Sequence, residues 1–417
     1  MQLTEEEEAW ARGESGPAVA MATRILAEMG RILGADRLIP VTSAHIDGCL
    51  YHGNSGVHFA ERLVEGGGQV RVPTTLNVGA LNLLKPESGL MPPHQREMAR
   101  RLMAAYVAMG CRQTWTCAPY QVGHRPGQGE DIAWAESNAV VFANSVLGAR
   151  TNRYGDFLDI CAALTGRAPH YGLHIEANRR ATVLVRTDSL SEALKRSSVF
   201  FPVLGAWLGR TVGSDIAAIE GLPRDTSEDA LKALGAAAAS TGAVALFHAI
   251  GVTPEAPTLE AAFGGQDPTL VLDLTGERVR GALETLSTTT RGEKLDVIAL
   301  GSPHYSLPEV LRFEMAREGR RFALPVTICT NRFVRDVLER QGKIAEMEAA
   351  GVEFITDTCV VVTPILPPTG GVLMTDSGKF AHYTPPNTGY SVAYGSVSEC
   401  VESAVAGRIV RSEETWR

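Results

Sequence analysis

The sequence predicts an α/β protein whose sheets are mostly parallel, and two observations support this fold class. Segments typical of strands and of helices alternate along the whole chain, as in proteins whose parallel strands are joined by helical crossovers. With 45% hydrophobic and 21% charged residues, the composition is that of a globular protein with an ample core. The length of 417 residues leaves room for two or three domains.

Helix signals are clear in the first part of the chain. Thr4 precedes four glutamates, which together make a capped and acidic helix start. Proline at the first turn and glycine past the end mark other helices. The helices predicted in this part span residues 4–14, 17–33, 93–109 and 138–147. Short apolar runs, each leading into a polar loop, predict strands at residues 37–40 and 69–72.

Beyond residue 180 the alternation of strands and helices becomes regular. The strands predicted here span residues 182–185, 199–204, 242–247, 271–274, 296–300, 324–328 and 352–355. The predicted helices span residues 190–196, 227–240, 277–286, 307–319 and 331–341. A weakly charged connection at residues 256–266 is a candidate domain boundary.

Charge and the N-terminal sequence exclude several classes of protein. The 47 acidic and 39 basic residues give a net charge of −8, which argues against a general nucleic-acid surface. No segment approaches the roughly 18 uninterrupted apolar residues of a membrane span, and the acidic N-terminus is unlike a signal peptide. We therefore expect a cytoplasmic protein. Motifs for P-loops, nucleophile elbows and HExxH zinc sites are absent from the sequence.

The seven cysteines are an odd number without tight spacing, which predicts free thiols in a reducing compartment. Cys329 and Cys359 each follow a strand-like run, where ligands bind in parallel sheets, and Cys117 lies in a turn. Three such thiolates can hold an iron–sulfur or zinc centre. The alternative is three unrelated buried thiols, because no compact CxxC motif is present. We expect packing roles for Cys49, Cys111, Cys161 and Cys400.

Polar side chains follow three of the predicted strands, at the ends where pocket residues gather. We predict that these residues line a pocket, and the alternative is hydrogen bonding within loops or helix capping. His45 and His304 also suit general acid–base catalysis or the orientation of a hydroxyl group. The pocket candidates are Ser43, His45, Asp47, Thr75, Asn77 and His304.

Charged and amide side chains frame the helix predicted at residues 138–147. Glu136, Ser137 and Asn138 lie at its start, where one of the nearby glutamates is expected to cap the helix. The two glutamates are Glu130 and Glu136, and the one that does not cap the helix is either catalytic or orients an arginine. Arg150, Asn152 and Arg153 follow its end, where the arginines either clamp an acidic substrate or complement the helix dipole. Farther along, Lys379 is either an anion contact or an exposed lysine.

Eight motifs, taken in order, resemble the aconitase X family of iron-dependent dehydratases over essentially the full length. They read TCAPY, GEDIAWAESNAV, FANSVLGARTNR, IEGLP, LGSPH, ICT, DTC and KFAHY. The resemblance implies an aconitase-like large subunit with three α/β/α domains around a central metal-cluster cleft. We place these domains at residues 1–188, 189–290 and 291–417, with two cluster cysteines in the third.

The resemblance further implies an iron–sulfur cluster held by Cys117, Cys329 and Cys359. A 2Fe-2S cluster is favoured, and a 4Fe-4S cluster or a single iron is the alternative. A separate small swivelling-domain subunit is expected as partner, because the family's usual smaller part is not found in this sequence. The chain departs from the expected family pattern at Asn331 and Asp376, which leaves the substrate less certain than the chemistry.

The resemblance implies a hydro-lyase that dehydrates a small hydroxy acid, with cis-3-hydroxy-L-proline, the substrate of the family's bacterial branch, as the leading substrate. Mevalonate 5-phosphate is the alternative substrate, and the other readings are a metal-free binding subunit of the same fold and a thiol enzyme using Cys329 with His304. The resemblance implies that the base is a serine of the small subunit. Our catalytic candidates are His45, Glu136 and His304. The candidate substrate-binding residues are Ser43, Asp47, Thr75, Asn77, Ser137, Asn138, Arg150, Asn152, Arg153 and Lys379.

Overall fold

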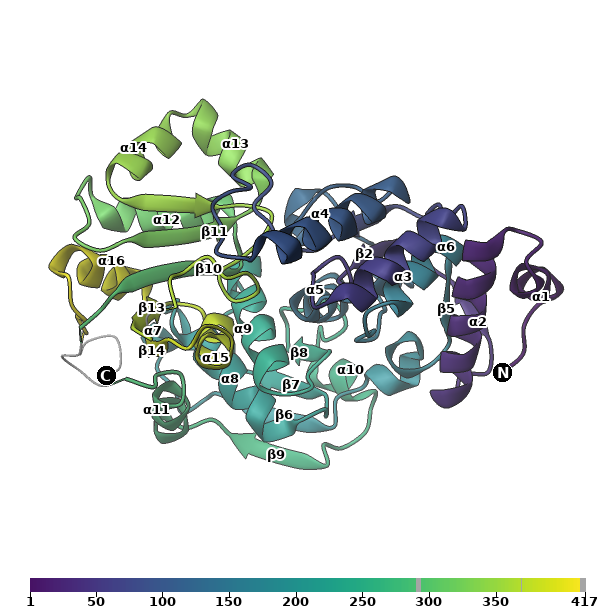
Figure 1. Cartoon of the computed structure of the whole chain (residues 1–417). Coiled ribbons are helices and arrows are strands. Elements are labelled where there is room, and N and C mark those ends of the chain that lie inside the picture. The colour runs from purple at the N-terminus through teal and green to yellow at the C-terminus, as the bar shows by residue number, and fades with distance from the viewer. Residues whose placement is uncertain (290–293, 369, 413–417) are drawn as a thin grey trace. The chain divides into compact units, whose positions relative to one another are not determined.

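The computed structural model describes residues 1–289, 294–368 and 370–412, and the chain forms two compact units. The first unit contains Met1–Leu81 and Met91–Arg180, and the second contains Asn82–Leu90 together with the chain from Ala181 onward. Both are α/β in architecture, and their main sheets are parallel, as the sequence predicts (Figure 1).

The first unit is built around a short parallel sheet with the strand order β3-β2-β4. Its strands are β2 (Ala44–Ile46), β3 (Thr74–Leu76) and β4 (Ala133–Trp134). Strands β1 (Leu38–Pro40) and β5 (Arg167–Pro169) form a separate antiparallel pair. In the chain, β1 precedes the strands of the parallel sheet and β5 follows them. The helices are α1 (Glu5–Arg12), α2 (Pro17–Ile32), α3 (Asn54–Glu65), α4 (Pro93–Ala108), α5 (Ser137–Phe142) and α6 (Leu158–Thr165). Helix α6 packs against β2 and β4, and α3 packs against α4.

The helix ends of the first unit follow the capping signals of the sequence. The Thr4 hydroxyl accepts a hydrogen bond from the backbone N–H of Glu7, whose side chain accepts one from Thr4 in return. Proline occupies the first turn of α2, and α4 likewise begins at a proline. The predicted helix at 138–147 is present as α5 followed by one π-helical turn at Ala143–Leu147. These boundaries confirm the predictions to within a few residues.

The second unit contains two parallel sheets. The four-stranded sheet has the order β8-β7-β6-β9, from β6 (Val183–Arg186), β7 (Ala217–Glu220), β8 (Phe247–Ala249) and β9 (Leu270–Asp273). The five-stranded sheet has the order β12-β11-β10-β13-β14, from β10 (Val297–Tyr305), β11 (Val326–Thr330), β12 (Val352–Ile355), β13 (Val372–Thr375) and β14 (Ser391–Tyr394).

Ten α-helices surround these sheets within the described part of the second unit. They are α7 (Glu192–Lys195), α8 (Phe200–Val212), α9 (Glu228–Thr241), α10 (Leu259–Phe263), α11 (Gly276–Glu284), α12 (Leu307–Arg317), α13 (Arg332–Arg340), α14 (Lys343–Ala349), α15 (Gly378–Thr388) and α16 (Val397–Ala406). Helices α8 and α9 pack closely because Gly205 and Gly209 lie against the α9 backbone. The segment Asn82–Leu90 joins this unit through hydrogen bonds to Asp357 and to the Pro364 carbonyl.

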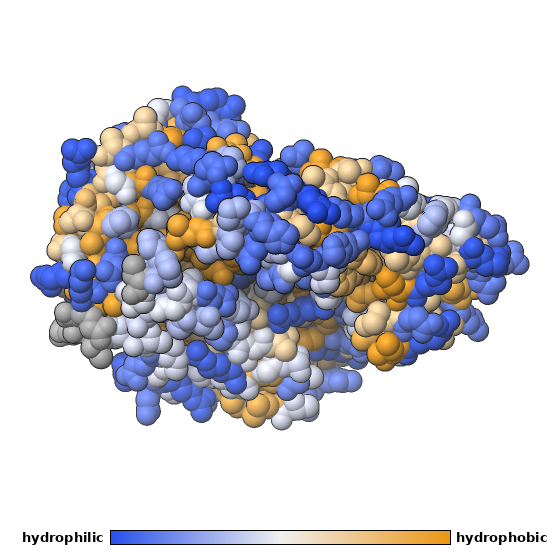
Figure 2. Space-filling model, viewed as in Figure 1, coloured by the Kyte–Doolittle hydropathy of each residue, from blue (hydrophilic) through white to orange (hydrophobic). Residues whose placement is uncertain are grey.

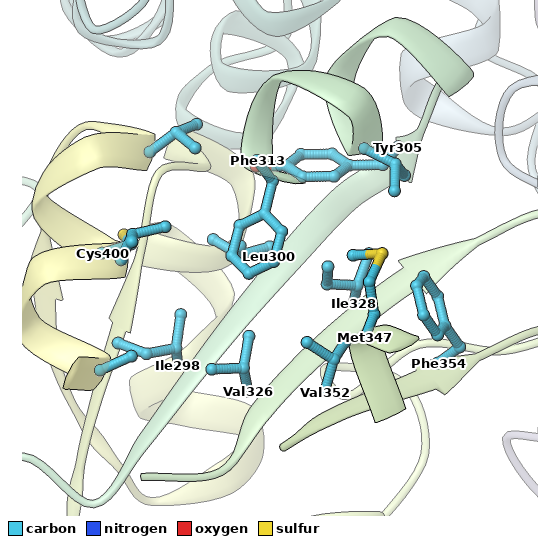
Figure 3. Close-up of a cluster of buried hydrophobic side chains, with 14 of the residues drawn as sticks. Ile298, Leu300, Tyr305, Phe313, Val326, Ile328, Met347, Val352, Phe354 and Cys400 are labelled. Atoms are coloured by element: carbon cyan, nitrogen blue, oxygen red, sulfur yellow. The ribbon is translucent and has the colours of Figure 1, made fainter. Parts of the chain in front are cut away.

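The two faces of the five-stranded sheet bury different sets of side chains. Figure 3 shows Ile298, Val326 and Ile328 in one apolar cluster, which also contains Phe313 and Cys400. Successive residues of a strand point to opposite faces, so the neighbouring residues of these strands belong to a second cluster. That second cluster contains Val297, Ala299 and Cys329. The strand alternation thus directs Cys329 away from the core of Figure 3.

Several predicted elements differ from the structure. The predicted strand at 199–204 is the start of helix α8, because an apolar run buried all round does not reveal its period. The predicted strand at 69–72 is irregular, and the strand of this region is β3 instead. The predicted strand at 242–247 reaches β8 only at its last residue. Strands β2, β4, β5, β7, β13 and β14 and helices α3, α6, α10, α14, α15 and α16 were not predicted.

The compact units also differ from the domain ranges drawn from the sequence. Strand β6 lies before the predicted boundary at residue 188, yet it pairs in parallel with β7 and β9. These pairings place β6 in the four-stranded sheet of the second unit. The segment Asn82–Leu90 likewise leaves the first predicted range for the second unit.

The face drawn in Figure 2 is largely hydrophilic, with smaller apolar areas between the polar side chains. None of the helices in the described ranges combines the length and the apolar character that a bilayer crossing requires.

A truncation in the core of Figure 3 tests this packing. Ile328 is fully buried in β11, whereas Met315 of α12 is 77% exposed. We expect Ile328→Ala to lower the free energy of unfolding by about 2–5 kcal/mol, because it leaves a cavity. Met315→Ala should change it by no more than about 0.5 kcal/mol. Urea denaturation followed by circular dichroism measures both, and equal midpoints for the two variants would contradict the assigned core.

Candidate functional site

The polar candidates of the first unit gather at the carboxyl ends of its three parallel strands. His45 of β2 is paired in register with Thr75 of β3 and Trp134 of β4. Because strand side chains alternate with a period of two, the next residues on the same face are Asp47, Asn77 and Glu136. His45 and Thr75 therefore lie within strands, whereas the sequence placed them in the loops that follow strands. We refer to His45, Asp47, Thr75, Asn77 and Glu136 as the polar edge; the structure brings these five predicted residues together.

Asp47 is the carboxylate that the polar edge perturbs most clearly. The pKa of Asp47 is raised to about 7, mainly by burial and in smaller part by the negative charges of Glu136 and Asp156. The Asn77 amide donates a hydrogen bond to Asp47 and partly opposes this shift. A carboxyl group with such a pKa exchanges a proton readily near neutral pH.

Asp159 of α6 fixes the loop that carries Asp47, although no local pattern in the sequence distinguishes it. Its side chain accepts hydrogen bonds from the backbone N–H groups of Asp47 at 2.7 Å and Gly48 at 3.2 Å. It also accepts one from the N–H of Ile160 at 2.7 Å. Burial raises the pKa of Asp159 to about 6, an effect that these N–H donors oppose.

The start of helix α5 connects the polar edge to Cys117. The Glu136 carboxylate caps the helix by accepting the N–H of Ala139 at 2.7 Å, which confirms the capping prediction for this glutamate. It also accepts a hydrogen bond from the Ser137 hydroxyl at 3.2 Å. The Asn138 amide donates to the Cys117 carbonyl and to the Tyr120 hydroxyl, both at 2.9 Å. Asn138 thus fixes the backbone at Cys117.

Cys117 lies just beyond the end of β3 because the N–H of Thr116 donates to the Leu76 carbonyl at 3.2 Å. Its side chain is buried. Cys49, Cys111, Cys161 and Cys400 are also buried, and burial raises the pKa of each of these four thiols. Such thiols stay protonated, in agreement with the packing roles expected for them.

Several buried polar atoms of this region have no hydrogen-bond partner within the described residues. Such atoms are uncommon in folded proteins and call for a specific explanation, such as a bound ligand or water. Trp134, which is fully buried, and His124 join the polar edge here, although the sequence reasoning missed both. The unpartnered atoms are Ser43 Oγ, His45 Nε2, Asn77 Oδ1, His124 Nε2, Trp134 Nε1 and Asn138 Oδ1.

The Arg-Thr-Asn-Arg run after α5 is held mainly by structural contacts. The Asn152 side chain donates to the Tyr171 carbonyl at 3.0 Å and accepts from the N–H of Leu173 at 2.8 Å. Arg150 forms an ion pair with Glu176 at 3.4 Å, and Arg153 is exposed. None of these contacts joins the three residues to the polar edge, and their predicted role in substrate binding stays a prediction.

In the second unit, Cys329 and Cys359 belong to one buried apolar cluster. Cys329 lies in β11 opposite Ile355 of the neighbouring strand β12, and Cys359 follows β12 in a tight turn. The Cys359 carbonyl accepts from the N–H groups of Val362 and Thr363 at 3.2 and 3.1 Å. The structure thus brings together two of the three predicted metal-binding cysteines.

His304 lies beside the turn that carries Cys359. Its Nε2 donates to the Thr358 carbonyl at 3.1 Å. The segment from Gly301 to His304 belongs to β10 and does not form a loop after it, although the β10–β11 register is irregular between Leu300 and Tyr305. Gly301 has φ +89°, and a Cβ atom there would lie 2.0 Å from the Cys329 carbonyl oxygen, so glycine permits this close approach.

A buried ion pair stabilises the same turn. Asp357 has φ +66° and is fully buried, and its carboxylate accepts two hydrogen bonds from Arg332, at 2.6 and 2.8 Å. Arg332 begins α13, which Asn331 caps by accepting the N–H of Val334 at 2.9 Å. The unusual Asn331 of the sequence therefore serves as a helix cap.

A cavity of about 420 Å³ lies in the second unit. None of its lining residues belongs to the apolar cluster that contains Cys329 and Cys359. Asp376 lines both this cavity and a smaller one, and Lys379 lines the smaller. The buried Lys232 pairs with Asp229 at 3.1 Å and with Glu309. Burial alone would lower the pKa of Lys232, but the two carboxylates raise it overall. The sequence analysis did not single out this cluster. Lys232, the one lysine of the alanine-rich helix α9 (Glu228–Thr241), is the signal that could have indicated it.

Neither unit, within its described residues, groups three His, Cys, Asp or Glu side chains as ligands of one metal ion. The three predicted cysteines are divided, with Cys117 in the first unit and the other two in the second. As donors they fit an iron–sulfur group, since all three are buried thiols whose loops are fixed by backbone hydrogen bonds or strand pairing.

Comparison with protein-family models gives three consecutive matches. Residues 1–177 match the aconitase X first domain, residues 181–284 the second domain and residues 295–406 the third domain.

Several curated proteins are similar over nearly the whole chain. A cis-3-hydroxy-L-proline dehydratase of Pseudomonas aeruginosa is 43% identical over 97% of this chain and 70% of its own length. One of Hypocrea jecorina is 41% identical over 98% of this chain and 69% of its own length. A phosphomevalonate dehydratase large subunit of Methanothermobacter thermautotrophicus is 38% identical over 94% of this chain and 96% of its own length.

Among solved structures, the crystal structure of the holo-form of Thermococcus kodakaraensis aconitase X superposes with a TM-score of 0.87. It is 36% identical in sequence, and the superposition covers 97% of this chain and 100% of that one.

The raised pKa of Asp47 makes a prediction about stability. Folded Asp47 holds its proton up to a pKa of about 7, against 3.8 in the unfolded chain. The folded state therefore binds more protons between about pH 4 and 7, so this group makes stability fall as pH rises through that range. Asp47→Asn removes the effect, and the variant should gain stability relative to the wild type from pH 4 to 7.

Urea denaturation at several pH values measures this difference. The control is Asp36→Asn, because a hydrogen bond from His170 lowers the pKa of that exposed carboxyl. Asp36 is therefore charged in both the folded and the unfolded state above about pH 4, and the stability curves of Asp36→Asn and the wild type should run parallel from pH 4 to 7. Stability curves for Asp47→Asn and wild type that run parallel over this pH range would contradict the buried, perturbed carboxyl.

Proposed function

We propose that this chain, which belongs to the aconitase X family, is a hydro-lyase that removes water from a small hydroxy acid. The observation that carries the proposal is the likeness to named dehydratases over 94–98% of the chain. The polar edge supports it, since a dehydration needs groups that accept and donate protons near neutral pH. Asp47, with a pKa of about 7, is such a group.

The substrate that we propose is cis-3-hydroxy-L-proline, converted to Δ1-pyrroline-2-carboxylate. The two relatives with this activity in their names are 43% and 41% identical to the chain, against 38% for the phosphomevalonate dehydratase large subunit. In the reaction a base removes the proton next to the carboxylate, and the bond between C3 and the hydroxyl oxygen breaks. The departing hydroxide gains a proton and leaves as water, and the enamine tautomerises to the product.

We further propose that Cys117, Cys329 and Cys359 bind an iron–sulfur cluster. When bound, such a cluster supplies an open iron that acts as a Lewis acid toward the departing hydroxyl. The chain's own residues hold these ligands in place. Asn138 fixes the backbone at Cys117, and the β11–β12 pairing with the Cys359 turn fixes the other two.

The polar edge would bind and orient the substrate. The Asp47 carboxyl and the Asn77 amide offer a donor and acceptors for the hydroxyl and amine groups of a hydroxyproline. The Glu136 carboxylate lies in the same row and favours a bound cation such as the ring ammonium. His304 donates its Nε2 proton to the Thr358 carbonyl and so supports the loop of Cys359. For this histidine we propose a positioning role.

We propose a small swivelling-domain subunit as partner, which would carry the serine base. Support comes from the relatives: this chain matches 96% of a protein named as a large subunit, but 70% of the Pseudomonas aeruginosa dehydratase. The remainder of that longer relative is the size of an additional domain.

The activity is tested with anaerobically purified protein, alone and with the candidate small subunit. Formation of Δ1-pyrroline-2-carboxylate from cis-3-hydroxy-L-proline is the expected result, and mevalonate 5-phosphate is assayed in parallel. Dehydration of mevalonate 5-phosphate alone would show that the chain acts on that substrate and not on hydroxyproline. A protein that binds hydroxyproline but releases no water, even when reconstituted with iron and sulfide, would be a binding subunit of the same fold.

Metal content tests the ligand assignment independently of activity. We expect Cys359→Ala to lower bound iron and sulfide at least about fivefold after reconstitution, because a thiolate ligand is lost. Cys161→Ala is the matched control, since Cys161 is fully buried within α6 and packs there. Its iron content should stay near the wild-type value. Equal losses in both variants would indicate general misfolding, and no loss in either would remove Cys359 from the ligand set.

A further inference from the structure

Thr75 lies between two imidazole rings. Its hydroxyl oxygen is 2.9 Å from Nδ1 of His45 and 2.7 Å from Nδ1 of His124. Thr75 and His45 are fully buried and His124 is 8% exposed. No other hydrogen bond of this hydroxyl is present among the described residues. The hydroxyl group must therefore satisfy both rings with one hydrogen and its lone pairs.

The count of hydrogen atoms determines the tautomers of the two rings. A threonine hydroxyl has one hydrogen, so it donates to one Nδ1 and accepts a hydrogen bond from the other. The ring that receives the hydroxyl hydrogen has a bare Nδ1, and its proton sits on Nε2. The ring that donates to the hydroxyl has its proton on Nδ1, and its Nε2 carries a free lone pair. One histidine thus presents an N–H group and the other presents an acceptor.

Other arrangements of hydrogens are disfavoured. If both rings donated to Thr75, its own hydrogen would be buried without an acceptor, at a cost of about 1–3 kcal/mol. If neither ring donated, one of the two contacts would hold no hydrogen at all. A charged ring is disfavoured as well, because burial lowers the pKa of His45 well below its ordinary value and that of His124 to about 4. Both rings are neutral at neutral pH.

The Nε2 atoms of His45 and His124, which do not face Thr75, are among the unpartnered atoms of the site. Nε2 of His45 and Nε2 of His124 are buried and have no partner within the described residues. Trp134 lies beside both rings, with centroid separations of 5.7 and 5.2 Å, and its Nε1 is also unpartnered. Three polar ring nitrogens without partners lie around neighbouring rings, and such atoms call for a bound ligand or water that completes their hydrogen bonds.

We propose that Thr75 is a positioning residue that holds His45 and His124 in opposite tautomers, so that the pair presents one proton acceptor and one proton donor to the bound hydroxy acid. This inference rests on the proposed dehydratase function for the identity of the ligand. The serine base proposed above takes the proton from carbon, so the donor of this pair suits the departing hydroxyl, which gains a proton, and the acceptor suits a hydrogen-bond donor of the substrate.

The arrangement also permits a balanced proton relay. The accepting ring gains a proton on Nε2 and passes its Nδ1 proton to the Thr75 oxygen. The hydroxyl gives its own hydrogen to Nδ1 of the second ring, which releases its Nε2 proton. One proton has then moved from one Nε2 to the other, no charge remains, and the two rings have exchanged tautomers.

Nuclear magnetic resonance tests the tautomers directly. In the full chain labelled with 15N in histidine rings, long-range proton–nitrogen spectra distinguish Nδ1–H from Nε2–H rings. Spectra of His45→Gln and His124→Gln assign the two signals. We expect opposite tautomers for His45 and His124 in the wild type and in Thr75→Ser, which keeps the hydroxyl. Thr75→Val, of nearly equal shape, should abolish the opposite pattern.

Thr74→Val is the matched control, because Thr74 is buried in the same strand but its hydroxyl donates to the Val72 carbonyl. It should leave both tautomers unchanged. The same tautomer on both rings of the wild type would overturn the proposal, and so would an unchanged pattern in Thr75→Val.

Kinetics with cis-3-hydroxy-L-proline test the role in turnover. We expect Thr75→Val to lower kcat on the order of 10²-fold, the usual worth of a positioned acid–base group, with KM within about threefold. Thr75→Ser should retain most activity. Opposite tautomers in the wild type together with full activity in Thr75→Val would overturn the positioning role. If no hydroxy acid is dehydrated, the proposed function fails, and the spectra still decide the tautomers.

Discussion

The register of three short parallel strands is the constraint on which the polar site depends. Pairing of His45 with both Thr75 and Trp134 places their side chains in one row. The residues that follow His45 and Thr75 in their strands, Ile46 and Leu76, are fully buried and face the opposite side of the sheet. A slip of one residue in β2 would exchange these faces and bury polar groups in the apolar core. The apolar packing of the sheet therefore fixes the polar constellation.

Burial then drives the titratable groups of this edge toward their neutral forms. It raises the pKa of Asp47 and Asp159 and lowers the pKa of His45 and His124, since each charged form loses its hydration. A site assembled in this way holds donors and acceptors with little net charge. With Asp47 and Asp159 protonated, the site would repel the carboxylate of the proposed zwitterionic hydroxyproline only weakly, and proton transfers within it would avoid separated charges in a poorly hydrated environment.

Local signals in the sequence were sufficient for much of the fold. Thr4 and Ser227 each cap the helix that the sequence placed after them, because a cap depends on neighbours within one turn. The apolar start of α8 was misassigned, since its burial on all sides comes from packing against α9 and leaves no periodic polar face. Strands β7 and β13 were missed, and both are short strands whose pairing partners lie far away in the chain.

The same distinction explains the site. His45, Asp47, Thr75 and Asn77 were found because polar residues follow the apolar runs at residues 38–41 and 70–72, and Glu136 was found because it lies at the start of a predicted helix. His124 was missed because its importance arises from a single contact with Thr75, 49 residues earlier in the chain. Asp159 was missed for a similar reason, since its partners at Asp47 and Gly48 are more than 100 residues away. Long-range hydrogen bonds carry no local pattern, so they appear only in three dimensions.

The two units contribute different kinds of side chains to the proposed chemistry. In the first, hydrogen-bonding side chains gather on a sheet edge where buried polar atoms lack partners. In the second, Cys329 and Cys359 lie among apolar neighbours such as Val360 and Phe380. An apolar shell of this kind would limit the access of water to a metal bound there. Each part is fixed by strand pairing and turns within its own unit.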